Sequence, residues 1–323
     1  MVNISDTVSS KLRNANVLFT ILITWGHVAW DLPYWAIGFF AVSVPCFFAI
    51  SSFLYFKSFD FDHPFQDYKK KVVGRFKSLV IPFLIFNAVG FVVKLLFHIV
   101  HPAVYKNPVD DLLNGNVLFY ILGSDANGPL WYFLSLYAFV LVAPIMGYII
   151  RLSKYTILLL PLIYWLFKDF SYYSFPYWMV EIFIGTYIAI FYEEIRNSRI
   201  LDNKFISGGI LLLITIIVLH CMEIVDAYNL RVIAPLGFIA IYRVCDILPN
   251  ALVKFLSPYS ILIYCLHIPV SIFVSYIPKV LHVEQNHAIA CVEITVITIL
   301  VIAGVGYILR KNRIVWEIVT GGR

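Results

Sequence analysis

The sequence predicts an all-α integral membrane protein of about ten transmembrane helices with both termini in the cytoplasm. Of its 323 residues, 61% are hydrophobic and 13% are charged, with a mean hydropathy of +0.85, whereas soluble domains are roughly 45–50% apolar and about 25% charged. Ten apolar segments follow one another along the chain, and Lys and Arg gather in alternate loops. This composition excludes a soluble globular domain and a disordered chain. A nucleic-acid-binding protein is excluded as well, because the net charge of +5 forms no basic face on a soluble domain.

The ten segments are bounded by prolines or by clusters of charge. A stretch of about 20 apolar residues is long enough to cross the hydrocarbon core of a bilayer. The predicted segments are 16–31, 35–56, 79–101, 130–150, 155–167, 176–192, 205–224, 230–246, 255–277 and 288–309. The fifth is short and contains Pro161, so it is either a short span or a re-entrant segment. We expect one membrane domain over residues 1–323 and no separate soluble domain.

The distribution of basic residues sets the orientation. With a cytoplasmic N-terminus and ten spans, 19 of the 24 Lys and Arg residues lie on the cytoplasmic side, in agreement with the positive-inside rule. Omitting the fifth span would place the later basic loops and the C-terminal basic cluster on opposite sides. The N-terminus has no small-residue cleavage pattern, so the first helix is expected to be retained.

The five cysteines indicate neither a disulfide framework nor a zinc site. They are odd in number, lie far apart within apolar runs and show no metal-ligand spacing. We interpret them as small core residues.

His27 is the first candidate for chemistry. It follows Arg13 by 14 residues, a rise of roughly 21 Å along a helix, which predicts an imidazole deep in the membrane. An ionisable group at this depth is a functional candidate, because exposing it to lipid is costly. A neutral imidazole among apolar residues can act as a base or nucleophile near neutral pH. The alternative is a structural His that is hydrogen-bonded between helices or lies at the membrane interface.

The second apolar segment and the loop after it contain two further features. Ser51 and Ser52 follow a Pro-containing stretch, and small residues permit either close helix packing or backbone contact with a ligand. The basic cluster that follows comprises Lys69, Lys70, Lys71, Arg75 and Lys77. It either binds lipid headgroups or a phosphorylated cosubstrate, or it serves only as a positive-inside anchor.

Two more motifs lie at helix entries. Residues 127–134, Asn-Gly-Pro-Leu-Trp-Tyr-Phe-Leu, open the fourth segment, and the Trp131–Tyr132 pair suits a binding site or an interfacial aromatic belt. Residues 257–267 end at His267, a second intramembrane imidazole. The intramembrane acids, each able to pair with a His or with Lys94, are Glu181 and Glu293.

In their order and spacing, five of these features resemble those of the integral-membrane acyltransferase family 3, the bacterial O-acyltransferases that modify surface polysaccharides and related envelope molecules. The matching features are His27 in the first helix, VPCFFAISSFL at 44–54 (similar to VPLFFxISGFL), Arg75 ahead of LVIP at 79–82 (similar to R-x-L-x-x-P), LWYFL at 130–134 (similar to LWFL) and YSILIYCLH at 259–267 (similar to YSLxIYLLH). Together they cover most of the chain.

Two positions differ from the family pattern. Family members commonly have an Arg eleven residues before the first-helix His, where this chain has Asn16, with Arg13 one turn earlier. Because Asn supplies no permanent positive charge, either Arg13 or the basic cluster with Lys71 and Arg75 replaces that Arg, or donor handling differs. Ser52 stands where the family motif has Gly.

The resemblance implies transfer of an acyl group, usually acetyl from acetyl-CoA, to a hydroxyl of a saccharide or lipid-linked sugar at the bacterial inner membrane. It implies His27 as the base or the acyl-carrying nucleophile, with donor-binding residues Arg13, Asn16, Lys71 and Arg75. The supporting residues that it implies are Trp131 and Tyr132 for stacking on a sugar or closing the site, Ser260 or Tyr264 for donating to the oxyanion, His267 for orientation or packing, and Glu181 as an intramembrane acid. Acetyl-CoA would be the only cofactor, with membrane lipids and the acceptor sugar as partners and no metal or nucleic acid.

Two alternatives remain open from the sequence. One is a secondary transporter or flippase for a polar envelope precursor, with His27, Glu181, Lys94 and Glu293 as relays. The other is a non-catalytic scaffold on the same fold. This alternative stays open because Asn16 stands where family members commonly have an Arg.

Overall fold

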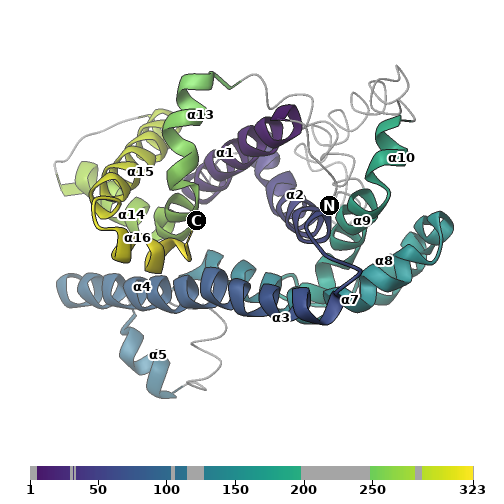
Figure 1. Ribbon diagram of the computed structural model, residues 1–323. Helices are drawn as coiled ribbons and strands as arrows, with labels where there is room; N and C mark the ends of the chain where they lie inside the picture. The colour runs from purple at the N-terminus through teal and green to yellow at the C-terminus, as the bar shows by residue number, and fades with distance from the viewer. Residues whose placement is uncertain are drawn as a thin grey trace. The chain divides into compact units, whose positions relative to one another are not determined.

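The computed structural model describes residues 6–29, 32, 34–102, 106–114, 127–197, 248–280 and 286–322. These residues form helices joined by turns and short connections, and no strand occurs among them (Figure 1). The all-α prediction is therefore confirmed. The chain divides into two compact units, Met1–Lys70 with Phe139–Pro258 and Lys71–Ala138 with Tyr259–Arg323. The single membrane domain over 1–323 stays a prediction.

The first unit is organised around one central helix, α2. Helix α1 (Asp6–Val28) packs on one side of α2 (Tyr34–Lys57), and α9 (Met179–Ile190) packs closely against it as well. The other helices among its described residues are the N-terminal part of α3 (Pro64–Arg75), the C-terminal part of α7 (Trp131–Arg151), η3 (Lys154–Leu159), α8 (Leu160–Phe167), η4 (Phe175–Trp178), α10 (Tyr192–Asn197) and α13 (Asn250–Leu256). The fully buried large side chains of this core include Phe19, Ile23, Phe48, Tyr55, Phe139, Ile150 and Ile182.

The second unit is built on the pair α14 and α15, which lie side by side in Figure 1. Its helices are η1 (Phe76–Val80), α4 (Ile81–Val100), α5 (Pro108–Asn114), η2 (Gly128–Leu130), the N-terminal part of α7, η7 (Ser257–Tyr259), α14 (Ser260–Val280), α15 (His287–Leu309) and α16 (Arg313–Thr320). Helix α4 contacts α14 and α16. These helices are those of the described residues of this unit, and the fully buried large side chains among them include Leu79, Phe83, Leu130 and Leu262.

Local sequence explains where several helices begin and end. Asn286 caps α15 by accepting from Ala288 N–H, and Asn312 caps α16 by accepting from Ile314 and Val315 N–H, which satisfies N-terminal donors that have no partner inside the helix. Gly321 ends α16 in the left-handed region at φ +68°, a conformation that costs glycine little.

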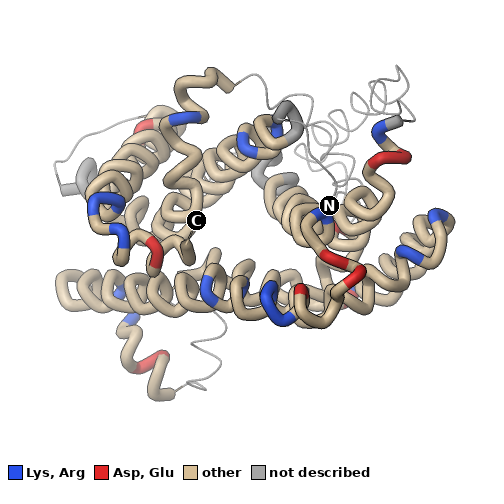
Figure 2. The backbone as a smooth tube through the Cα atoms, viewed as in Figure 1, with Lys and Arg blue, Asp and Glu red and all other residues tan. Residues whose placement is uncertain are grey.

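Within the part of the chain that the structure describes, four helices are long and apolar enough to cross a membrane. They are Pro64–Val100, Gly128–Arg151, Asn250–Tyr276 and His287–Leu309, and between 33% and 50% of each apolar window is buried inside the protein. The remaining apolar surface is what a bilayer would cover. Figure 2 shows long uncharged stretches in α4 and α15, with basic residues following α15.

Eight of the ten predicted segments overlap helices of the structure. The fifth and sixth correspond to shorter apolar helices, Lys154–Phe167 and Phe175–Ile190. The segments 205–224 and 230–246, together with Cys221 and Cys245, lie outside the described residues, so the ten-span count and the sidedness of the termini stay predictions. Cys46, Cys265 and Cys291 are buried.

Candidate functional site

Helix α1 has five polar residues at helical spacing, from its polar N-terminal half to its last turn. Arg13, Asn16, Thr20, Thr24 and His27 recur at intervals of three or four residues, which places them on the same side of a helix. Thr20 and Thr24 are buried, and their hydroxyls donate to the carbonyls of Asn16 at 2.8 Å and Thr20 at 2.9 Å. We call these five residues the α1 polar face. The two threonines were missed in the sequence, although their helical spacing from His27 is a usable signal.

The ends of the α1 polar face differ in exposure. His27 is half-buried in the last turn of α1, whereas Arg13 and Asn16 are exposed. The Arg13 guanidinium donates to Ser10 Oγ at 3.4 Å. Because Arg13 shares a face with Asn16, it can present a positive charge on the same side of the helix from one turn earlier.

Ser52 lies at the contact between α2 and α9. A Cβ atom at Gly185 of α9 would lie 2.0 Å from Ala49 O and 2.1 Å from Ser52 Oγ, so the close approach depends on a glycine in the partner helix. Ser52 Oγ donates to Ala49 O at 3.0 Å within α2. Glu181 lies one turn before Gly185 and is fully buried, so the same packing holds this acid inside the first unit.

The basic cluster lies on α3 and on the π-helical turn η1. Lys69, Lys70 and Lys77 are exposed, whereas Lys71 and Arg75 are half-buried. Within η1 the N–H of Ile81 bonds to Phe76 O five residues earlier, and the next residue, Pro82, has no N–H to continue the ladder. The cluster therefore ends where the helix changes its winding, next to the apolar α4.

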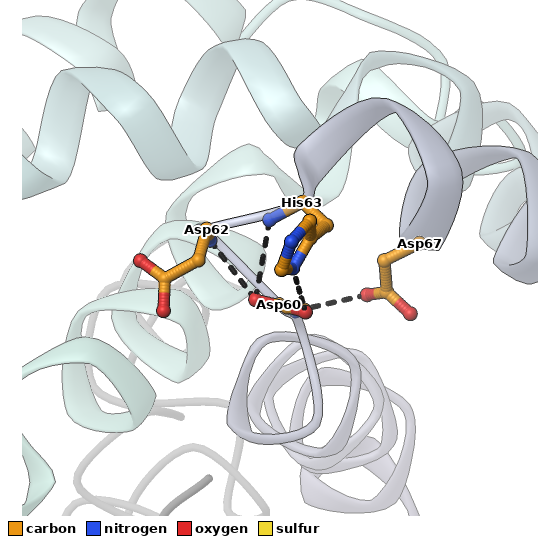
Figure 3. A network of polar contacts seen from close by, with 4 residues as sticks. All are labelled: Asp60, Asp62, His63 and Asp67. Atoms are coloured by element: carbon orange, nitrogen blue, oxygen red, sulfur yellow. Dashed lines mark hydrogen bonds and ion pairs between the residues drawn. The ribbon is translucent and has the colours of Figure 1, made fainter.

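The loop before α3 is fixed by Asp60, as Figure 3 shows. Its Oδ1 accepts from Asp62 N–H at 2.9 Å and from His63 N–H at 3.3 Å, and its Oδ2 lies 3.1 Å from His63 Nδ1. Asp67 Oδ2 in turn accepts from Asp60 N–H at 3.0 Å. The backbone N–H of Asp62, followed by the His63 side chain, lowers the pKa of Asp60. The network sets how the chain turns from α2 into the basic cluster.

In the second unit, the entry to α7 is bonded to α14. The Tyr264 hydroxyl donates to Pro129 O at 2.5 Å, and the Tyr264 ring stacks on Phe133 with centroids 5.4 Å apart. Asn127 Nδ2 donates to Cys265 O at 2.8 Å. The sequence analysis singled out the motif that contains Asn127 but gave Asn127 itself no role. Pro269 is the sequence feature that indicates such a role, because proline has no N–H to donate to the Cys265 carbonyl.

His267 is fully buried one turn after Tyr264. Its Nδ1 lies 2.8 Å from Tyr264 O and 3.2 Å from Ile263 O. Carbonyls only accept, so Nδ1 bears a proton and, in the neutral ring, Nε2 is the acceptor. Its own helix thereby fixes the orientation of the imidazole.

The structure groups some predicted residues and divides others. Trp131, Tyr132 and Ser260 are buried in the second unit, where the Tyr132 ring meets Tyr264 edge-on at 5.7 Å. The predicted site residues of this unit are Lys71, Arg75, Trp131, Tyr132, Ser260, Tyr264 and His267. Those of the first unit are Arg13, Asn16, His27 and Glu181. Of the predicted relays, Lys94 is half-buried on α4 and Glu293 is exposed on α15.

Comparison with known proteins identifies one family. The family model described as an acyltransferase domain, that of acyltransferase family 3, matches residues 14–310 of the 323. The matched region contains His27, the α2 motif, Arg75, the LWYFL motif and His267. Comparison with curated proteins and with solved structures finds no match to this chain.

Proposed function

Because this chain belongs to acyltransferase family 3 and is a multi-pass membrane acyltransferase, we propose that it transfers an acetyl group from acetyl-CoA to a hydroxyl of a surface saccharide or a lipid-linked sugar. The site of action is the inner membrane of a bacterium. The observation that supports this proposal best is the family match over residues 14–310, which includes every motif of the predicted site.

His27 is the proposed reacting group. As a base, the neutral imidazole takes the proton of the acceptor hydroxyl while the hydroxyl oxygen attacks the thioester carbonyl. The C–S bond then breaks, and the imidazolium returns the proton to the CoA thiolate. As a nucleophile, the imidazole nitrogen attacks the thioester carbonyl, the C–S bond breaks and CoA leaves as a thiol with the imidazole proton, which gives an acyl-histidine. The acceptor hydroxyl oxygen then attacks the acyl carbon, the bond from that carbon to the imidazole nitrogen breaks, and the hydroxyl proton passes to the imidazole. Both routes need a half-buried imidazole that a substrate can reach, which agrees with its exposure.

The donor is proposed to bind through basic side chains. CoA is anionic, and charge-assisted hydrogen bonds to phosphate suit Arg and Lys. Arg13 at the exposed end of the α1 polar face and the half-buried pair Lys71 and Arg75 fit this requirement. Arg13 lies roughly 21 Å along α1 from His27, so the thioester of a donor held at Arg13 would have to reach along the α1 polar face. Asn16, on the same face, would contribute hydrogen bonds without charge.

Acceptor binding and oxyanion stabilisation are proposed for the second unit. Trp131 and Tyr132 would stack on a sugar or close the site, and Ser260 or Tyr264 would donate to the developing oxyanion. The Tyr264 hydroxyl already donates to Pro129 O, so its donation to an oxyanion requires that bond to be exchanged.

Labelled acetyl-CoA tests the function. Membranes that contain the protein should incorporate label into a glycan fraction, and membranes of the host that lacks it should not. A transporter or flippase would move its substrate without dependence on CoA, so glycan labelling that is unchanged by the presence of the protein would contradict the proposal.

A further inference from the structure

Asn127 occupies a helix-capping position without capping the helix. An Asn directly before a helix usually accepts from backbone N–H groups of the first turn, but the Asn127 side chain makes no such bond to η2. Its Nδ2 instead donates to Phe86 O on α4 at 3.2 Å and to Cys265 O on α14 at 2.8 Å. The side chain thereby joins three elements of the second unit.

Pro269 explains the bond to α14. In an α-helix the carbonyl of Cys265 would accept from the N–H of residue 269, and proline has none. Asn127 supplies a donor in its place. Because both partners of the amide are carbonyls, which only accept, Nδ2 must face them and the orientation of the amide is fixed.

This orientation leaves Asn127 Oδ1 as a buried acceptor. Asn127 is 1% exposed, and Oδ1 has no hydrogen-bond partner among the described residues. A buried acceptor left unsatisfied is unfavourable, most of all where water is scarce. The next residue, Gly128, is exposed, and a Cβ atom there would meet no described atom within 4 Å. The acceptor therefore belongs to the residue directly before an exposed glycine.

We propose that Asn127 Oδ1 binds substrate by accepting a hydrogen bond from a hydroxyl or amide N–H group. This inference rests on the proposed function, whose substrates provide both kinds of donor: the hydroxyls of the acceptor saccharide and the amide N–H groups of the pantetheine arm of acyl-CoA. Tyr264 supports the assignment, because it is half-buried, bonds to Pro129 two residues from Asn127 and contacts the Tyr132 ring. Aromatic rings beside a polar acceptor are suited to bind a sugar.

Three variants separate substrate binding from helix bonding. Asn127→Leu removes the amide at similar size. Pro269→Ala gives the Cys265 carbonyl a helical N–H donor, so the bond from Asn127 is no longer needed there. The double variant lacks the amide but keeps this carbonyl satisfied. For each, we would measure transfer of label from acetyl-CoA to glycan in membranes of the native host, acetyl-CoA binding to the purified protein, and the melting temperature.

Transfer by the double variant is expected to stay about 10-fold or more below that of Pro269→Ala, which is the loss associated with one substrate hydrogen bond. The melting temperature of the double variant is expected to rise from that of Asn127→Leu toward that of Pro269→Ala. If the donor is a saccharide hydroxyl, the Kd of acetyl-CoA is unchanged. If it is a pantetheine amide, that Kd rises and saturating acetyl-CoA restores transfer.

Equal transfer by the double variant and Pro269→Ala would overturn the inference, since Asn127 would then only bond helices together. This comparison holds even if Asn127→Leu alone does not fold. No transfer by the wild-type protein would instead contradict the proposed function.

Discussion

Among single residues, His27 is the one on which the proposed chemistry depends. His27→Ala and His27→Gln are expected to abolish transfer with near-normal membrane insertion and acetyl-CoA binding. Loss of general acid–base catalysis costs about 10²–10⁴-fold, and loss of a nucleophile costs more. Label transfer and acetyl-CoA binding would be measured side by side.

His267→Ala is the matched control. Its Nδ1 is bonded to carbonyls of its own helix, so we expect it to orient or pack and its removal to cause a smaller loss. A purely structural His27 would behave differently, because Gln retains a hydrogen-bonding amide. Full transfer by His27→Gln would therefore contradict the catalytic role and favour the carrier or scaffold alternatives.

Asp60 makes a pH-dependent contribution to the loop between α2 and α3. Its pKa is lowered in the folded protein by Asp62 N–H and the His63 side chain, so the carboxylate favours folding above its unfolded pKa of about 3.9. This contribution is lost as the pH falls through the lowered folded value. Asp60→Asn should thus lower the melting temperature at pH 7, and the difference from wild type should shrink below about pH 4. A difference that is independent of pH would contradict this account.

The basic cluster on α3 and η1 is predicted to bind acyl-CoA. Lys71→Ala and Arg75→Ala are expected to raise the KM for acyl-CoA more than they lower kcat, because ion pairs with CoA phosphates act in the ground and transition states alike. Added salt should raise the same KM, since both side chains are partly exposed and dissolved ions screen charges that solvent reaches. Lys311→Ala, which removes one exposed cation beside α16, is the control. Unchanged KM in both variants would leave the cluster as a topology anchor.

The α2–α9 contact predicts a different kind of sensitivity. Gly185→Ala would place a Cβ atom against Ala49 O and Ser52 Oγ, and overpacking of this kind costs about 1–3 kcal/mol. Gly304→Ala on α15 is the control, because a Cβ there meets nothing within 4 Å. We expect a lower melting temperature in detergent for the first variant only. Equal melting temperatures of the Gly185→Ala and Gly304→Ala variants would mean that α2 and α9 can move apart without loss of stability, which would contradict this prediction.

The sequence predicts helices better than it predicts contacts between them. Apolar runs and prolines located α4, α7, α14 and α15, because hydropathy is a local property. The packing of Gly185 on Ser52 and the bond from Asn127 to Cys265 join residues more than a hundred positions apart. No local sequence pattern predicts contacts between residues so far apart. Pro269 could show that a carbonyl needs a donor, but only the fold shows that Asn127 provides it.

Orientation of the whole chain in the membrane depends on the fifth segment. Lys154–Phe167 combines a 3₁₀ turn with two turns of α-helix, a length of roughly 24 Å against a core of about 30 Å. If it nevertheless spans, Asp169→Cys is accessible to a membrane-impermeant thiol reagent only from outside, and Asp62→Cys only from the cytoplasm. Cytoplasmic labelling of Asp169→Cys would make the fifth span and every later assignment wrong.

The packing of α2 against α9 also bears on how the protein is made. The two contacting positions, Ala49 and Gly185, are separated by 136 residues of sequence. At a synthesis rate of roughly 5–20 residues per second, about 7–27 s pass between translation of one and of the other. During this interval α2, with its buried Ser43 and Ser52, must wait in the bilayer or at the insertion machinery for its partner. Slower or faster translation of the intervening segment should therefore change the yield of folded protein.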